Sequence, residues 1–171
     1  GPDASFTGLS EAYCENADIV SELICVNTPA EFSGPGVFGN EFNAQSAGVG
    51  DHTVTCSYTD AFGCTGTSAQ GVTVNPLPVA SVISAQGDII ICEGGSVTIV
   101  GNTGGAWSNG QSGASITVSQ PGTYSVTNTN SCGSVTSNVV TVTVNPQPTA
   151  SVISAQGNTT FCQGGSLTIS G

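Results

Sequence analysis

The chain has 171 residues, with no Lys or Arg, 11 Asp and Glu and one His, which gives a formal net charge of −11. Binding to nucleic acid and docking on anionic lipid both depend on Lys and Arg, so this composition excludes both. No apolar run approaches the roughly 18 residues of a membrane-spanning helix, so we expect no membrane insertion.

The first part of the chain predicts short strands separated by turns. Gly34–Gly36 and Gly39-Asn40 are turn signals. The segment Asp51–Tyr58 alternates with period two, as a half-buried strand does, which places on one face His52, Val54, Cys56 and Tyr58. Val72–Val74 predicts a closing strand, because Pro76 follows it and proline cannot donate to a strand ladder.

The middle of the chain predicts plainer strands, at 96–100, 114–118, 123–127 and 139–144. Turns are predicted between them, at 108–110, 120–122 and 130–133. Pro121–Tyr124 resembles a tyrosine corner, in which the hydroxyl bonds to nearby backbone. No stretch has a helical period. The predicted fold class is therefore all-β: tandem immunoglobulin-like β-sandwich domains in an elongated rod, with almost no helix.

An internal repeat sets the predicted domain organisation. Residues 72–101 and 142–171 are identical at 21 of 30 positions, at a period of 70 residues. The expected domains are 1–76, a complete repeat at 77–147 and the N-terminal part of a third repeat at 148–171. Two proline hinges, Val74–Pro78 and Val144–Pro148, are expected to make the links short and stiff. Because two strands cannot hide an apolar face, we expect the chain to be a window of a longer repetitive protein.

The cysteines predict a disulfide framework rather than a metal site. There are seven, and no two have a C-x-x-C spacing. Four fall in the first unit and allow three connectivities. Cys14 opens its unit as Cys92 opens the next, and Cys64 follows a late turn as Cys132 does. The pairs favoured on this basis are Cys14–Cys64, Cys25–Cys56 and Cys92–Cys132, and Cys162 is expected to stay unpaired. Such bridges indicate an oxidising compartment.

Few residues are candidates for catalysis or for binding a cofactor. His52 is the only imidazole, and nothing in the sequence pairs it with a serine, so we expect no enzyme activity and favour a structural role like that of Tyr124. Asp60 could bind Ca²⁺ together with turn carbonyls, but more commonly such an Asp bonds its own turn backbone. No other cofactor is expected.

Two further motifs concern carbohydrate. Trp107 could stack on a sugar ring, although a single Trp in such a domain is more often part of the core. Asn158-Thr159-Thr160 fits the three-residue N-glycosylation pattern. Burial of Trp107 would separate a structural unit from a sugar-binding module.

Several motifs together resemble the tandem repeats of giant Bacteroidota cell-surface adhesins, with gliding-motility adhesins of the SprB type as the best match. In the first part they are Tyr13-Cys14, Phe32–Val37, Ala47–Val54, Tyr58–Cys64 and Val72–Pro76, and in the middle Cys92–Val97, Ala106–Gly110 and Gly122–Val126. Cys25 and Cys56 depart from the pattern, since they stand where small or aromatic residues are expected. The resemblance implies export by the type IX system and an extracellular location on the cell surface, and it brings no catalytic residues.

Three functions follow as hypotheses. The first is a structural segment in the extended stalk of a secreted adhesin or filament, serving adhesion or gliding motility, whose partners are neighbouring repeats of the same chain. In that case surface glycans or other substrate surfaces would be bound through other parts of the protein. The second is a carbohydrate-binding module of a secreted protein, and the third, ranked last, is an enzyme.

Overall fold

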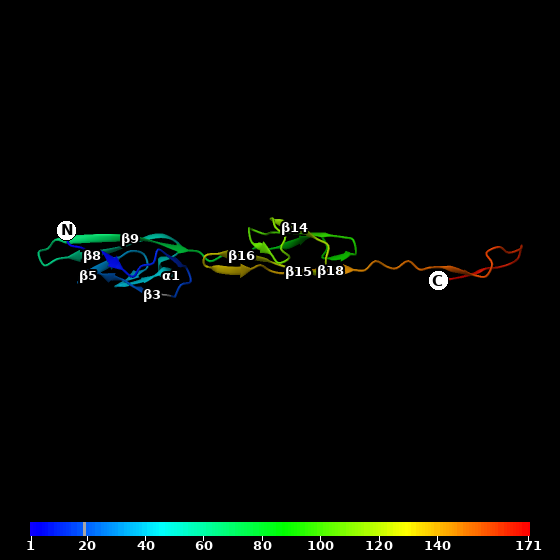
Figure 1. The fold of residues 1–171 in the computed structure, drawn as a ribbon, viewed down its shortest axis with the longest axis horizontal. Coiled ribbons are helices and arrows are strands. Elements are labelled where there is room, and N and C mark those ends of the chain that lie inside the picture. Colours follow the sequence, from blue (N-terminus) through cyan, green and yellow to red (C-terminus); the bar gives the residue numbers. More distant parts are fainter. Residues whose placement is uncertain (19) are drawn as a thin grey trace.

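The computed structural model describes residues 1–18 and 20–171. In these residues the regular secondary structure is almost entirely β, with one single-turn helix, α1 (Ala44–Ala47), and twenty strands, most of them short. Two bodies of strands follow one another along the longest axis of the molecule, and a thin C-terminal segment continues beyond them (Figure 1). The prediction of an all-β fold with almost no helix is confirmed.

The first body is built on a long hairpin. Its strands β8 (Gly50–Thr59) and β9 (Thr65–Asn75) pair antiparallel over ten residue pairs. The short strands β2 (Ala12–Cys14) and β5 (Ala30–Ser33) extend this sheet to the order β2-β9-β8-β5. β2 runs parallel to the end of β9, so the start and the end of this body lie at the same edge.

A smaller sheet completes the sandwich of the first body. It has the order β3-β7-β6, with β3 (Val20–Glu22), β7 (Glu41–Asn43) and β6 (Val37–Phe38). β1 (Phe6–Thr7) pairs with β4 (Ile24–Cys25) beside it. The α1 turn follows β7, because the side chain of Asn43 accepts a hydrogen bond from the Ser46 N–H at 2.8 Å and caps the helix start.

One apolar cluster holds the first body together. Alternate residues of its strands face inward, as period-two patterning requires. The side chains of Phe42 and Val54 are fully buried, and Phe6 packs edge-on against the half-buried Phe32 with ring centroids 5.4 Å apart. The remaining buried members are Ala4, Tyr13, Leu23, Cys25, Ala44, Cys56, Val72 and Val74.

The second body repeats the arrangement with shorter strands, in three small sheets. The first has the order β10-β12-β14, the second β11-β18-β15 and the third β13-β16-β17. Their bounds are β10 Ser84–Gln86, β11 Ile90–Cys92, β12 Val97–Val100, β13 Ala106–Trp107, β14 Ser115–Val118, β15 Gly122–Tyr124, β16 Val126–Asn130, β17 Gly133–Thr136 and β18 Val140–Asn145. The strand predicted at 123–127 is thus interrupted at Ser125, whose N–H bonds the Ser108 hydroxyl instead of a neighbouring strand.

The second body has a core of its own. It gathers around Ile99 and Val126, which are fully buried, and around Trp107, which is 4% exposed. The other buried members are Ile83, Val97, Ile116, Val118, Tyr124, Val140 and Val142. No residue belongs to both clusters in the described part of the chain.

The C-terminal segment repeats the first hairpin of the second body. β19 (Ser154–Gln156) pairs with β20 (Thr168–Ser170) in the register in which β10 pairs with β12. The packing differs: Ile153 and Ile169 are 69% and 60% exposed, whereas their repeat equivalents Ile83 and Ile99 are 2% and 0% exposed. The hairpin register therefore repeats, while burial of its apolar face needs a facing sheet.

Candidate functional site: a disulfide-bonded junction

The most distinctive chemical feature of the molecule joins the two bodies. Cys14, at the end of β2 in the first body, is bonded to Cys132, in the turn between β16 and β17 of the second body. The two cysteines are 118 residues apart in sequence and their Cα atoms are 5.5 Å apart. This bridge links the two bodies covalently at residues outside both core clusters.

The parallel pairing of β2 with β9 places Cys14 at the junction. The last pair of this ladder is Cys14 with Asn75, and the next N–H, that of Glu15, donates to the Asn75 carbonyl at 3.0 Å. Pro76 follows immediately and ends the strand, because it has no N–H to give. Cys14 thus lies where the chain leaves the first body.

Asn130 positions the other half of the bridge. β16 and β17 are joined by the two-residue turn Ser131-Cys132, and the Asn130 Oδ1 accepts the Cys132 N–H at 2.8 Å. The Nδ2 of the same side chain donates to the Pro76 carbonyl at 3.0 Å. A single side chain therefore shapes the turn and ties it to the linker.

The linker itself is bonded on both sides. Toward the first body, the N–H of Leu77 donates to Glu15 Oε1 at 2.9 Å. Toward the second, the N–H and the hydroxyl of Ser81, which is 1% exposed, both bond to Asn128 Oδ1, at 3.1 and 2.7 Å. The Ser81 oxygen also accepts the Thr103 N–H at 3.2 Å. Polar groups held in this way oppose free rotation of the two bodies.

A hollow of about 420 Å³ lies beside the bridge. It is lined by Ser10, Ala12, Tyr13, Cys14, Ala17, Asn75 and Ser131. Burial by itself would raise the pKa of Tyr13, but hydrogen bonds from Ser21 and Ser10 to its hydroxyl outweigh burial and lower the pKa. The hydrogen bonds with Ser10 and Ser21 thus hold the Tyr13 side chain in place in the lining of this hollow.

The predicted bridges Cys14–Cys64 and Cys92–Cys132 are wrong. Cys64 and Cys92 are free and exposed, as is Cys162. The physical reason is strand length: Cys14 is level with Asn75, whereas Cys64 precedes Thr65 at the opposite end of β9. Eleven residues at about 3.3 Å each separate these ends by roughly 35 Å, far beyond the ~7 Å that a disulfide allows between Cα atoms.

The same reasoning applies in the second body. Cys92 is level with Asn145, at the end of β18, whereas Cys132 stands 13 residues earlier, before β17. Alignment of the repeats correctly matched Cys14 with Cys92 and Cys64 with Cys132, but it did not show that the two kinds lie at opposite ends of a unit. The end at which the opening-strand cysteine lies is set by the parallel pairing of that strand with the closing strand, which the repeat alignment does not contain.

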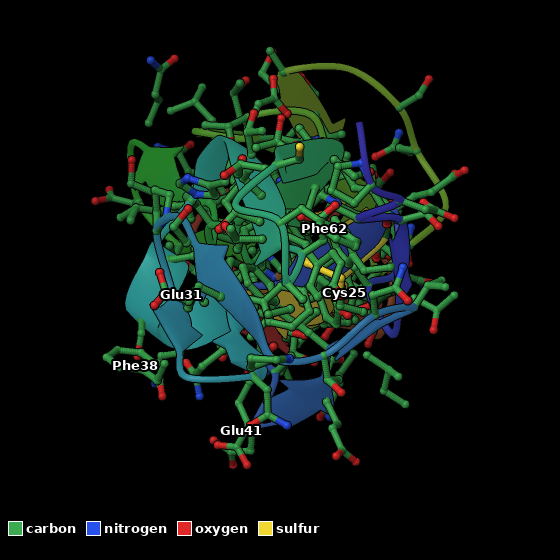
Figure 2. The ribbon with its side chains drawn as sticks, turned by 90° about the vertical axis from the view of Figure 1, so that its left-hand side faces the viewer. Cys25, Glu31, Phe38, Glu41 and Phe62 are labelled. Carbon is green, nitrogen blue, oxygen red and sulfur yellow. A yellow bond between two sulfur atoms is a disulfide. The ribbon has the colours of Figure 1, made fainter. Side chains whose placement is uncertain are left out.

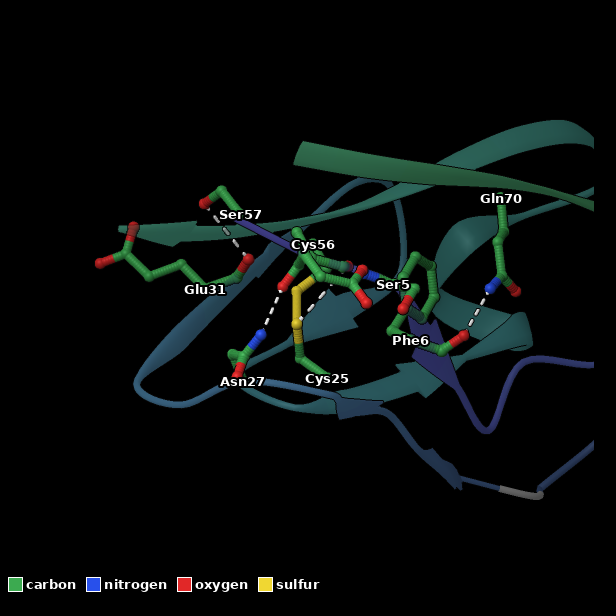
Figure 3. Close-up of a disulfide and its surroundings, with 10 residues drawn as sticks. Ser5, Phe6, Cys25, Asn27, Glu31, Cys56, Ser57 and Gln70 are labelled. Carbon is green, nitrogen blue, oxygen red and sulfur yellow. Dashed lines mark hydrogen bonds between the residues drawn. A yellow bond between two sulfur atoms is a disulfide. The ribbon is translucent and has the colours of Figure 1, made fainter. Parts of the chain in front are cut away.

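The second bridge lies inside the first core. Cys25 and Cys56 are bonded, with Cα atoms 6.7 Å apart, and their side chains are 7% and 0% exposed. Figure 3 shows this bridge between β4 and β8, with hydrogen bonds on either side of it. One of them runs from Asn27 Nδ2 to the Asp3 carbonyl at 2.8 Å, and another from Gln70 Nε2 to the Phe6 carbonyl at 2.6 Å.

His52 and Tyr124 make the same local contact. The Nε2 of His52 donates to the Gly48 carbonyl at 2.7 Å, and the hydroxyl of Tyr124 donates to the Gln120 carbonyl at 2.8 Å. Each acceptor stands four residues before its donor, which is the corner geometry predicted for Tyr124. The two side chains differ in their register against the closing strands. His52 is paired with Val72, whereas Tyr124 is paired with Val140, which stands two residues before Val142, the repeat equivalent of Val72.

Asp60 bonds its own turn. Its Oδ1 accepts the N–H groups of Phe62 and Cys64, both at 2.9 Å, and its N–H donates to the Cys64 carbonyl at 2.9 Å. Within residues 1–18 and 20–171, no three His, Cys, Asp or Glu side chains gather as a group that could hold a metal ion. The carboxylate thus has a structural use in the loop between β8 and β9.

Trp107 is a core residue. Its indole N–H donates to the Gly113 carbonyl at 2.8 Å, which satisfies the polar atom of this buried ring. The aromatic side chains that are exposed are scattered, namely Phe38 at 62%, Phe62 at 92% and Phe161 at 54%. In the view onto the end of the molecule, Phe62 lies within the end face and Phe38 at its margin (Figure 2).

The fold is that of tandem immunoglobulin-like β-sandwiches, here joined by a disulfide. In the described part of the chain no helix is long and apolar enough to cross a membrane. A scan against protein-family models gives no match, and a search of curated proteins gives none.

The solved structures to which this chain is similar are those of distant proteins. Murine CEACAM1b is 15% identical, with a TM-score of 0.38, over 79% of this chain and 96% of that chain. The insect immune protein hemolin is 15% identical, with a TM-score of 0.42, over 85% of this chain and 48% of its own. A Ca²⁺-stabilized adhesin with which an Antarctic bacterium binds ice is 13% identical, with a TM-score of 0.44, over 92% and 53%. The chain thus spans about half the length of the last two. At these identities and scores no function transfers to this chain.

Proposed function

We propose that this chain is a structural repeat segment of a secreted cell-surface adhesin or filament, in which it forms part of an extended stalk. The observation that carries the proposal is the Cys14–Cys132 bridge together with the bonded linker. A covalent bond and several hydrogen bonds across one junction resist bending and pulling, which is what a stalk needs and a compact enzyme does not. The extracellular location accords with the two disulfides.

The domain boundaries belong to this proposal. The two core clusters span 4–74 and 83–142, which supports units at 1–76 and 77–147 joined by the proline linker. The segment 148–171 is proposed to be the start of a third unit, because its β19–β20 hairpin has the register of β10–β12. The partners of each unit are then its neighbours in the same chain.

The proposed role in gliding motility and the proposed export by the type IX system rest on the sequence motifs. Both follow from the resemblance of those motifs to the repeats of giant Bacteroidota adhesins. The absence of Lys and Arg supports a filament of like-charged repeats, which repel each other at short range and stay separate. Screening at physiological salt limits this repulsion to about 8–10 Å, so it acts between touching surfaces.

The carbohydrate-binding alternative is weaker. Its most suitable side chain, Trp107, is buried and its indole N–H is already bonded. An enzyme is weaker still, because His52 is bonded to a backbone carbonyl four residues away. We therefore place ligand recognition in other parts of the protein, without a catalytic role for this chain.

Small-angle scattering on the oxidised chain tests the proposal. A compact globule of this length has a radius of gyration of about 16 Å. A stalk segment should give a clearly larger value and a distance distribution with a long tail. A radius near that of the globule would refute the stalk.

A further inference from the structure

The two exposed cysteines near the ends of the folded bodies, Cys64 and Cys92, are each equivalent to one half of the Cys14–Cys132 bridge. We propose that both are sites for disulfides to neighbouring units of the same kind. Cys92 takes the hairpin-turn cysteine of the unit that follows, and Cys64 takes the opening-strand cysteine of the unit that precedes. The inference rests on the proposed stalk and makes every junction in it covalent.

Cys92 has the backbone setting of Cys14. The ladder of β11 with β18 is parallel and ends at the pair Cys92 with Asn145, as that of β2 with β9 ends at Cys14 with Asn75. The N–H of Glu93 donates to the Asn145 carbonyl at 2.8 Å, and that of Glu15 donates to the Asn75 carbonyl at 3.0 Å.

The turns that follow the two cysteines also agree. The carbonyl of Cys92 accepts the N–H of Gly95, and that of Cys14 accepts the N–H of Ala17, both at 2.9 Å. The Cys92 thiol therefore stands where its own chain leaves the second body, as Cys14 does in the first.

Cys64 has the turn setting of Cys132. Each follows the long strand of a hairpin, and each gives its N–H to the side chain of an Asx residue that begins the turn. For Cys64 the acceptor is Asp60 Oδ1 at 2.9 Å, and for Cys132 it is Asn130 Oδ1 at 2.8 Å. The loop from Asp60 to Cys64 is two residues longer, but Cys64, like Cys132, directly precedes the second strand of its hairpin.

The surfaces around both thiols have room for a neighbour. Beside Cys92 a hollow of about 490 Å³ is lined by Glu93, Gly94, Ser119, Gln120, Pro121, Val144 and Pro146. Glu93, Val144 and Pro146 are the repeat equivalents of Glu15, Val74 and Pro76 at the bonded junction. Near Cys64, the side chain of Phe62 is 92% exposed.

At the bonded junction, the turn residue Ser131 lines the hollow next to Tyr13. The turn that carries Phe62 would occupy the corresponding hollow of a preceding unit. Burial of this ring would then accompany formation of the bridge at Cys64.

Formation of each bridge is an oxidation by thiol–disulfide exchange. The Cys92 thiolate attacks a small disulfide oxidant such as oxidised glutathione, which releases one thiol and leaves a mixed disulfide on Cys92. The thiolate of the incoming turn cysteine then attacks the Sγ of Cys92 and releases the second thiol. The two protein thiols lose two protons and two electrons, and the oxidant disulfide is reduced to two thiols.

A lengthened chain tests the inference. A second copy of residues 102–147 is attached after Gly171, which completes the third unit because 142–171 matches 72–101 up to Gly101. Both this chain and the 171-residue chain are folded in a glutathione redox buffer and alkylated. They are then digested with pepsin, because they contain no site for trypsin, and mapped by mass spectrometry without reduction.

The expected product has Cys92 linked to the copied Cys132, with Cys14–Cys132 and Cys25–Cys56 unchanged. Three thiols are alkylated in the 171-residue chain, and only two, Cys64 and Cys162, in the lengthened chain. Cys92→Ser should leave the copied cysteine alkylated, whereas the matched control Cys64→Ser should leave the new bridge intact.

Two results would overturn the inference: full alkylation of Cys92 in the lengthened chain, or a bond between Cys162 and the copied cysteine. Scattering on the same samples separates this inference from the proposed function. An elongated particle without the new bridge contradicts only the bridge, whereas a compact particle contradicts the stalk itself.

Discussion

Removal of the bridge between the two bodies should uncouple their stabilities. In the variant Cys14→Ser/Cys132→Ser, the second body loses its covalent tether to the first. Because Cys14 is paired with Asn75 in the folded first body, unfolding of the second body alone leaves a closed loop from Asn75 to Cys132, a span of 57 residues. The chain-entropy relation assigns about 4 kcal/mol to closing a loop of this length, and about 5 kcal/mol to the full span of 118 residues.

Trp107 makes this measurable. It is the only Trp in the sequence and lies in the second core, so its fluorescence during denaturant unfolding reports on that body alone. We expect the free energy of unfolding of the second body to fall by about 3–4 kcal/mol in the variant, because the hydrogen bonds of Asn130 and Glu15 across the junction remain.

The matched control is Cys64→Ser/Cys92→Ser, which removes two cysteines that are free in this chain and should leave the transition in place. A loss below 1 kcal/mol in the bridge variant would refute the reasoning. It would mean that the unfolded second body is not restrained by a folded first body.

Other predictions concern single contacts. Cys25→Ala/Cys56→Ala opens a loop of 31 residues in the first core and should lower the free energy of unfolding of the first body by about 3–4 kcal/mol, as measured by near-ultraviolet circular dichroism; an unchanged transition would contradict a stabilising role of this bridge. Trp107→Phe removes the indole bond to Gly113 and part of a buried ring, so the second body should lose about 1–3 kcal/mol in calorimetry; an unchanged transition temperature would contradict a core role. Asn130→Asp keeps the acceptor for the Cys132 N–H and deletes the donor to Pro76, so hydrogen exchange in the linker should quicken while the global stability changes by less than about 1.5 kcal/mol. Lys placed at exposed strand positions such as Thr117 and Thr141 should change stability by less than about 0.5 kcal/mol but increase self-association and cleavage by trypsin; if a dozen such substitutions alter neither, the exclusion of basic residues has no physical role of this kind.

The sequence by itself determined the local structure. The period-two pattern of 51–58 produced a strand because alternate side chains face a core, and the buried Val54 and Cys56 follow that pattern. The corner at Tyr124 and the burial of Trp107 were predictable from neighbouring turn residues and from the scarcity of aromatic residues. The repeat predicted the β19–β20 hairpin, since hairpin register depends on residues close in sequence.

Only the tertiary structure decided which cysteines meet. Spacing matched Cys14 with Cys92 and Cys64 with Cys132, yet the pairing depends on the end of the unit at which each lies. That end is set by a parallel ladder between β2 and β9, which joins residues about 60 positions apart and leaves no period in the sequence. Because a disulfide needs Cα atoms within about 7 Å, direction along the sheet outweighs repeat position, and the bond forms between successive bodies instead of within one.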